Sequence, residues 1–200
     1  MSFQEFDRLL RSRRMCRAYL ARPVARETVL EVVDAARRSP SAGHSQGVRF
    51  GVVTDEQQRL AVANSLGEAS YRERGFRPWF SAAPVHLFVG TDPDAYLARY
   101  SEADKASRPE EWPVEYTVLD GGKALMTLYL AAHARDLACG YLGPHRAEAA
   151  LSVVPWPTRW RFLGLVTLGY PDWEHQRPSA SHARGWRELD GVVSWWDPKS

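Results

Sequence analysis

Helical and strand patterns alternate along this chain, and that alternation limits the folds that it can adopt. Apolar side chains recur at helical spacing in four segments, which are residues 3–11, 27–38, 56–66 (where Asp55 is the expected N-cap) and 120–137. Strands are expected at residues 48–54, 83–90 and 161–170, and the last of these is apolar enough for the centre of a sheet. Short connections between alternating helices and strands favour helices packed on a sheet. The sequence therefore predicts an α+β or α/β sandwich.

A length of 200 residues suits one domain, which we expect to span residues 1–200. Apolar residues make up 44% of the chain and charged residues 25%, as in an ordinary soluble globular protein. No apolar run approaches the roughly 20 residues that span a bilayer, and residues 1–10 lack the apolar stretch of a signal peptide. The sequence therefore predicts a cytoplasmic protein without membrane contact, in which Cys16 and Cys139 are reduced, partly buried thiols.

Arginines crowd one short N-terminal segment, although the formal net charge of the chain is only +2. They are Arg8, Arg11, Arg13, Arg14, Arg17, Arg22 and Arg26. Guanidinium groups hold phosphate in bidentate geometry and keep their charge at any working pH, so the segment predicts an anion-binding site. Nucleic acid is not the expected anion, because such a site calls for a recognition helix or interleaved aromatic residues, and only Tyr19 lies nearby.

A loop of turn-forming residues at 39–47 contains a motif that resembles a hydrolase nucleophile. The residues from Gly43 to Gly47 match G-x-S-x-G, which works only on a strand-to-helix turn that lifts the serine above the sheet. Here a helix precedes the motif and a strand follows it, so Ser45 is not expected to be a nucleophile. A metal site is not expected either, because four of the histidines lack metal-binding spacing. They are His133, His145, His175 and His182.

The order of several short motifs resembles that of the nitroreductase family. The motifs are Arg13-Arg14-Met15-Cys16-Arg17-Ala18-Tyr19, Pro23-Val24, Ser39-Pro40-Ser41-Ala42-Gly43-His44-Ser45-Gln46, Ala83-Pro84-Val85, Gly140-Tyr141-Leu142-Gly143 and Leu168-Gly169-Tyr170-Pro171. The family pattern has Arg-Arg-Ser-x-Arg-x-aromatic, then Pro-Val, a helix, and Pro-Ser-x-x-Asn-x-Gln before a strand. Each motif alone is weak, but their order and spacing together are specific, and they cover essentially the whole chain.

The resemblance implies an FMN cofactor and indicates the residues that would hold it. Arg13 and Arg17 would bracket the phosphate and the carbonyl edge of the flavin ring, where a cation stabilises the anionic reduced flavin. Arg14 would add a phosphate contact or remain solvated, and Arg184 and Arg187 stand where the family places a second phosphate-binding basic pair. Further flavin contacts are implied at Met15, Ser39, Pro40, Ser41, His44, Gln46, Leu142 and Gly143.

These further contacts differ in kind. By resemblance, residues 39–41 reach over the flavin of the neighbouring subunit, and Leu142 and Gly143 offer backbone amides to the reactive nitrogen of the flavin. Two positions depart from the family pattern, because Met15 replaces a serine whose hydroxyl would contact the phosphate, and His44 replaces an asparagine. A neutral imidazole still donates or accepts one hydrogen bond, so His44 is expected to change the flavin environment rather than to prevent binding.

The resemblance also implies an architecture. The family fold is an α+β fold in which helices flank a mixed, mostly antiparallel sheet, and two chains intertwine as a homodimer. The long helix at 120–137 would lie in the dimer interface, and residues 171–200 would form an arm that embraces the partner. Residues 91–116, which several prolines interrupt, are expected to be an insertion with little regular structure that shapes the substrate pocket.

The implied activity is a ping-pong reaction, in which NAD(P)H reduces the flavin and the flavin then reduces a nitroaromatic, a quinone or a similar planar small molecule. Two alternatives stay open. One is a flavin-dependent dehydrogenase or oxidase that tailors a metabolite without nicotinamide, and the other is a non-catalytic flavin-binding protein. Because the flavin carries the redox chemistry, no catalytic side chain is predicted.

Overall fold

The computed structural model describes residues 1–105, 108, 111–112, 114–178 and 184–196. Its α-helices are α1 (Phe3–Ser12), α2 (Arg26–Arg37), α3 (Glu56–Ser65), α4 (Glu68–Glu73), α5 (Pro93–Tyr100), α6 (Tyr116–His133) and α7 (Pro144–Ala147). Its strands are β1 (Val48–Val53), β2 (Val85–Thr91), β3 (Ala138–Leu142) and β4 (Arg161–Gly169). Short 3-10 segments are η1 (Ala42–His44), η3 (Glu148–Val153) and η5 (Leu189–Gly191).

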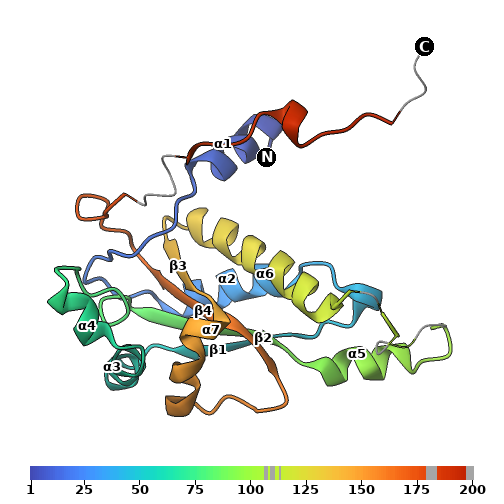
Figure 1. Ribbon diagram of the computed structural model, residues 1–200, viewed down its shortest axis with the longest axis horizontal. Coiled ribbons are helices and arrows are strands. Elements are labelled where there is room, and N and C mark those ends of the chain that lie inside the picture. The colour runs from blue at the N-terminus through green and yellow to red at the C-terminus, as the bar shows by residue number, and fades with distance from the viewer. Residues whose placement is uncertain (106–107, 109–110, 113, 179–183, 197–200) are drawn as a thin grey trace.

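The strands form one antiparallel sheet in the order β1-β2-β4-β3 (Figure 1). The interior position of β4 agrees with the apolar run that predicts a central strand at 161–170. Beyond β3, Met15 makes an isolated parallel bridge to Cys139, so the pairing is mixed but mostly antiparallel. The predicted α+β fold is confirmed.

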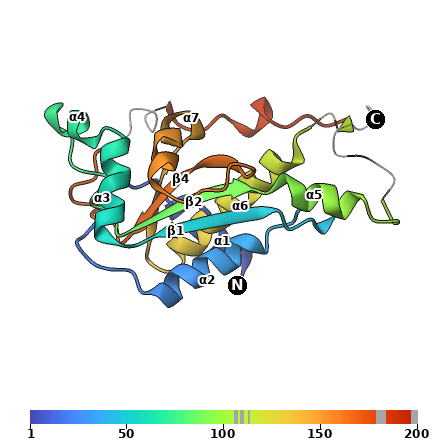
Figure 2. The same ribbon diagram turned by 90° about the horizontal axis from the view of Figure 1, so that it is seen from below.

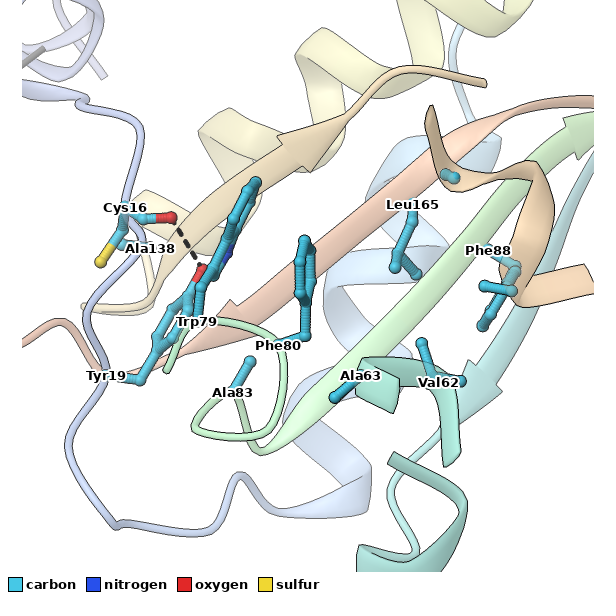
Figure 3. Close-up of a cluster of buried hydrophobic side chains, with 12 residues drawn as sticks. Cys16, Tyr19, Val62, Ala63, Trp79, Phe80, Ala83, Phe88, Ala138 and Leu165 are labelled. Atoms are coloured by element: carbon cyan, nitrogen blue, oxygen red, sulfur yellow. Dashed lines mark hydrogen bonds between the residues drawn. The ribbon is translucent and has the colours of Figure 1, made fainter. Parts of the chain in front are cut away.

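Helices cover both faces of this sheet (Figure 2). On one face α2 and α6 pack against the strands, and Leu128 of α6 belongs to the same buried cluster as Leu87 of β2. The other face carries an aromatic cluster around Trp79, Phe80 and Phe88 (Figure 3). The side chains of Leu87 and Phe88 lie on opposite faces of the sheet because side chains alternate along a strand. Every residue of β2 is buried, which explains why most of its residues are apolar.

The segment 91–116 is more regular than the sequence predicts. Pro93 occupies the first turn of α5, and the carboxylate of Asp92 accepts a hydrogen bond from the Asp94 backbone N–H at 3.3 Å. This proline therefore starts a helix instead of breaking one. The long helix α6 likewise begins at Tyr116, not at residue 120, and ends at His133. The prolines at 109 and 113 lie outside the described residues.

Two short elements, α4 and β3, are absent from the sequence prediction. Gly140 stands in the middle of the five residues of β3 and weakens its strand pattern. A Cβ at this position would overlap the Cys16 carbonyl oxygen and the Thr167 hydroxyl. Glycine is therefore required at this position, because the N-terminal segment passes directly against the strand.

The C-terminal arm extends away from the sheet (Figure 1). Its tryptophans are almost fully exposed, with Trp186, Trp195 and Trp196 at 96, 84 and 94% of their full accessible area. Helix α1 also contains no buried residue. Exposed large aromatic side chains such as these are typical of an interaction surface in a folded protein. In the part of the chain that is described, no helix combines the length and apolar character needed to cross a membrane.

Candidate functional site

The arginine-bearing segment is fixed along the edge of β3 by backbone hydrogen bonds. The Cys16 N–H donates to the Cys139 carbonyl at 2.8 Å, and the Leu20 N–H donates to the Tyr170 carbonyl at 2.9 Å. Between these two points the Tyr19 hydroxyl lies 2.7 Å from the Thr167 hydroxyl and donates to the Cys16 carbonyl (Figure 3). Residues 13–17 are therefore held by the sheet, although they belong to no strand themselves.

The arginines of this segment differ in their surroundings. Arg13 is half-buried, and its Nε is a buried donor without an acceptor among the described residues. A buried guanidinium donor without a partner is costly, so this position fits an anionic oxygen atom supplied by a ligand. Arg14, Met15 and Arg17 are exposed, but the Arg17 guanidinium lies over the Trp79 ring, 5.0 Å from its centroid. The structure thus brings Arg13 and Arg17 to one edge of the sheet.

A cavity of about 270 Å³ opens beside Arg17. Three guanidinium groups and three aromatic rings line it, and these belong to Arg17, Arg77, Arg177, Tyr71, Phe76 and Trp79. Gln176 also lines the cavity, and its side-chain oxygen accepts a hydrogen bond from the Arg17 N–H at 2.7 Å. Positive charge beside flat apolar walls suits a planar ligand with an electron-rich or anionic edge.

The Trp79 wall of the cavity is positioned by two buried groups. Its indole N–H donates to the Thr167 hydroxyl at 2.9 Å. The buried carboxylate of Glu68 accepts hydrogen bonds from the backbone N–H groups of Trp79, Phe80 and Ser81 at 2.7, 2.5 and 3.2 Å. Three donors on one carboxylate oxygen offset the cost of burying the charge. The turn that carries Trp79 is consequently rigid.

The loop at 39–47 is held against α5 and α6. Asp120, which is almost fully buried, accepts hydrogen bonds from the Ala42 N–H at 2.8 Å and the Tyr96 hydroxyl at 3.0 Å. The Ser39 hydroxyl lies 2.7 Å from the Thr127 hydroxyl, and Ser41 accepts from the Gln46 N–H. Within the described residues, no hydrogen bond or ion pair joins this loop to residues 13–17 of the same chain. The structure therefore does not bring Ser39, Pro40, Ser41, His44 and Gln46 together with Arg13 and Arg17.

Backbone strain is concentrated in the same loop. Gly43, His44 and Gln46 have φ values of 58°, 61° and 51°. This region suits glycine but is unfavourable for residues with a Cβ, and such strain tends to gather at functional sites. The hydrolase interpretation of Ser45 fails, because its hydroxyl donates to the Ala42 carbonyl at 2.6 Å and the motif lies between a helix and a strand, as the sequence predicts.

Leu142 and Gly143 lie at the end of β3, where Gly143 precedes α7. A second cavity of about 480 Å³ opens beyond them, and it includes His145, Trp156 and Trp160. It is larger than the cavity beside Arg17, but none of its lining residues carries a guanidinium or ammonium group. We therefore place the candidate anion site at the smaller cavity.

Arg184 and Arg187 are exposed on the C-terminal arm and form no hydrogen bond or ion pair with the described residues. The structure does not bring them to the N-terminal arginines.

No cluster of three metal-ligating side chains occurs within the described ranges, and His182 lies outside them. Cys16 and Cys139 are both free thiols and are more deeply buried than the sequence predicts, and burial raises the pKa of Cys16 to about 11.

Sequence reasoning missed the far wall of the cavity, which consists of Arg77, Trp79 and Arg177. One signal was available, because basic and aromatic residues alternate between α4 and β2 in the run Arg74-Gly75-Phe76-Arg77-Pro78-Trp79. No local pattern indicates that Arg177 meets this run, since 100 residues separate it from Arg77. The two segments meet where Arg177 donates to the Gly75 carbonyl at 3.0 Å.

The pattern of the Nitroreductase family matches residues 10–170 of the chain. The chain belongs to the nitroreductase family. Members of this family are flavin oxidoreductases, so the protein is a flavin-dependent oxidoreductase. The matched region includes the N-terminal arginines from Arg11 onwards, the cavity wall at 71–79 and the four strands of the sheet, and it ends just before the C-terminal arm.

Curated and solved relatives of this nitroreductase-family protein agree with the assignment. A 5,6-dimethylbenzimidazole synthase from Rhodospirillum rubrum is 30% identical over 93% of this chain and 91% of its own. A 4-nitrobenzoate reductase from Nocardioides sp. is 25% identical over 98% of this chain and 92% of its own. A Desulfovibrio desulfuricans protein solved in complex with FMN superposes with a TM-score of 0.67 at 21% identity, covering 96% of both chains. The fold is thus shared at low identity.

Proposed function

We propose that the protein binds FMN and, as a cytoplasmic homodimer, passes electrons from NAD(P)H to a nitroaromatic, a quinone or a similar planar acceptor in a ping-pong reaction. The observation that carries the proposal is the set of arginine groups without anionic partners at the β3 edge of the sheet. There Arg13 holds a buried donor without a partner, and Arg17 opens onto a cavity with three guanidinium groups. The name of the 4-nitrobenzoate reductase relative supports a nitroaromatic acceptor.

The residues at this edge fit FMN. Arg13 would hold an oxygen of the phosphate, and Arg17 would face the carbonyl edge of the ring, joined there by Arg77. The backbone of Leu142 and Gly143 would meet the ring from the end of β3, and the backbone amide of exposed Met15 would contact the phosphate, while Arg14 stays solvated. When bound, the flavin supplies the two-electron redox chemistry, while the protein supplies orientation and electrostatics.

A second copy of the chain would complete the site. Residues 39–46 lie apart from the arginines of their own chain but carry polar groups on a rigid, strained loop, which suits contacts with the flavin of a partner. The exposed arm would lie against that partner and bring Arg184 and Arg187 to a phosphate. On this proposal residues 1–200 form a single FMN-binding domain.

A metabolite-tailoring oxidase or dehydrogenase is the second candidate. The specific observation in its favour is the 30% identical relative, whose name is that of a synthase and not of a nicotinamide-dependent reductase. The third possibility raised by the sequence, a non-catalytic flavin protein, is set aside by membership of an enzyme family.

Anaerobic bleaching of the bound flavin tests these possibilities. The purified protein is expected to be yellow, to release FMN and not FAD on denaturation, and to lose its visible absorption when NADH or NADPH is added. Bleaching by a candidate metabolite alone, with no response to either nicotinamide, would favour the tailoring enzyme. A colourless protein that FMN cannot reconstitute would contradict both candidates.

A further inference from the structure

We infer that the cavity of about 480 Å³ beside α7 binds a small organic cation, with a methylated ammonium group held between its aromatic walls. This is a second ligand site, separate from the proposed flavin site, because Arg13, Arg17, Leu142 and Gly143 do not line it. Three features of the cavity carry the inference, which are its charge, its aromatic walls and the way in which the sheet fixes these walls.

The charge of this cavity is opposite to that of the cavity beside Arg17. Among the described residues that line it, Glu148 brings the only carboxylate, and lysine and arginine are absent. Glu148 is exposed and forms no hydrogen bond or ion pair within the described part of the chain. The Arg49 guanidinium lies 5.8 Å from the centroid of the Trp160 ring, but it is paired with Asp92 at 3.1 Å and does not line the cavity. A cationic ligand would therefore meet an unpaired carboxylate.

The walls of the cavity include three aromatic rings, which belong to Trp156, Trp160 and Phe162. Trp156 meets Trp160 at an interplanar angle of 82° with centroids 5.4 Å apart, and it meets Phe162 at 72° and 5.7 Å. Rings at such steep angles border a space from different sides, whereas stacked rings cover each other's faces. The face of an aromatic ring attracts a cation, and cages of such rings recognise quaternary and methylated ammonium groups.

The sheet holds Trp156 in place. The ring packs over Gly90 of β2, where a Cβ would come within 2.5 Å of it, and it lies beside Phe88 with centroids 6.4 Å apart. The Trp156 indole N–H donates to the Trp160 carbonyl at 3.3 Å, which ties two of the walls together. The aromatic walls are therefore in position before a ligand arrives, and binding costs little side-chain ordering.

The size and the donor set of the cavity favour an organic cation over a metal ion. A volume of about 480 Å³ lies within the common range of small-molecule pockets. Pro144 and Leu151 add apolar surface, which suits methyl groups. A hard cation such as Ca²⁺ takes six to eight oxygen ligands, and the described lining offers one carboxylate and the Thr158 hydroxyl.

Choline and 3,3-dimethyl-1-butanol test this inference, because they have nearly the same shape and differ in charge. Their affinities for the protein with its bound flavin can be measured by calorimetry. We expect choline to bind about tenfold more tightly than the neutral alcohol, and this preference should shrink at high salt. Equal affinities of the two ligands, or no binding of choline, would overturn the inference whether or not the protein binds FMN and oxidises NAD(P)H.

Glu148→Gln and Glu73→Gln form a matched pair of variants, since both glutamates are exposed and Glu73 lies outside the cavity. Glu148→Gln should lose most of the preference for choline, whereas Glu73→Gln should keep it. Trp160→Leu, which removes one aromatic face, should also reduce the preference. Equal losses in the two glutamate variants would reduce the effect to general surface charge and overturn the assignment. A full preference in both Glu148→Gln and Trp160→Leu would place the bound cation elsewhere and overturn it as well.

Discussion

Arg17 is the residue whose surroundings argue most directly for an anionic partner. Its guanidinium stacks on Trp79 and has no carboxylate partner among the described residues, while Arg14 is exposed and does not line the cavity. Arg17→Ala should weaken FMN binding by roughly 10- to 100-fold, since a charge-assisted hydrogen bond contributes about 1.5–3 kcal/mol. The reduction potential should also fall, because the anionic reduced flavin would lose its counter-charge. Fluorescence quenching of FMN and a redox titration measure the two effects.

Arg14→Ala is the control for that variant and should change neither quantity. Small, equal losses from both substitutions would show that the family roles of these arginines do not transfer to this chain.

Sequence reasoning found Arg13 and Arg17 because they form one short motif with recognisable spacing. It could not find Arg177, because the contact between the Arg177 side chain and the Gly75 carbonyl depends on how distant segments fold together.

His86 makes the folding stability of the protein depend on pH, which the sequence does not indicate. The ring is fully buried, its Nε2 lies 2.8 Å from the Phe80 carbonyl oxygen, and burial lowers its pKa to about 4 from an ordinary value of 6.5. Between pH 6.5 and about 4 the unfolded chain therefore binds a proton that the folded chain does not, so stability falls as the pH falls. The full loss is roughly 3 kcal/mol.

Urea unfolding of the wild type and of His86→Gln at pH 7 and pH 4.5 measures this contribution. The variant should be less stable at pH 7 but should lose less stability between the two pH values than the wild type. The exposed His145, replaced in the same way, should leave the wild-type pH dependence unchanged. Identical pH dependence in all three proteins would contradict the assignment to His86.

Among the elements, the short helix α4 positions the cavity through a single side chain. Glu68 is its first residue, and its carboxylate accepts three backbone hydrogen bonds from residues 79–81. Glu68→Gln should destabilise the protein by about 1–3 kcal/mol, because an amide cannot replace the charge-assisted bonds. Trp79 should also become more mobile. Glu73→Gln, at the exposed end of the same helix, should cost almost nothing in a parallel denaturation series. Equal losses from both variants would contradict this role.

Long elements could be predicted from the sequence, and short ones could not. α2, β2 and β4 each carry a pattern long enough to be recognised, and the structure reproduces them within a few residues. β3 and α4 are five and six residues long and depend on tertiary contacts, such as the close passage of Cys16 over Gly140. α5 was missed because Pro93 was interpreted as a break, although proline is also a favoured first residue of a helix.

At the scale of the whole molecule, the exposed arm predicts a homodimer. Trp195 and Trp196 are 84 and 94% exposed, and burying one indole of about 200 Å² contributes roughly 5 kcal/mol before the costs of association. The flavin-loaded protein should therefore sediment at twice the chain mass at micromolar concentration. Trp195→Ser combined with Trp196→Ser should shift it towards monomer and release FMN, because the partner's loop and arm would no longer complete the site. Trp173→Ser, at a 44% exposed position at the start of the arm, should leave both mass and flavin content unchanged. A flavin-loaded wild-type monomer would refute the shared site.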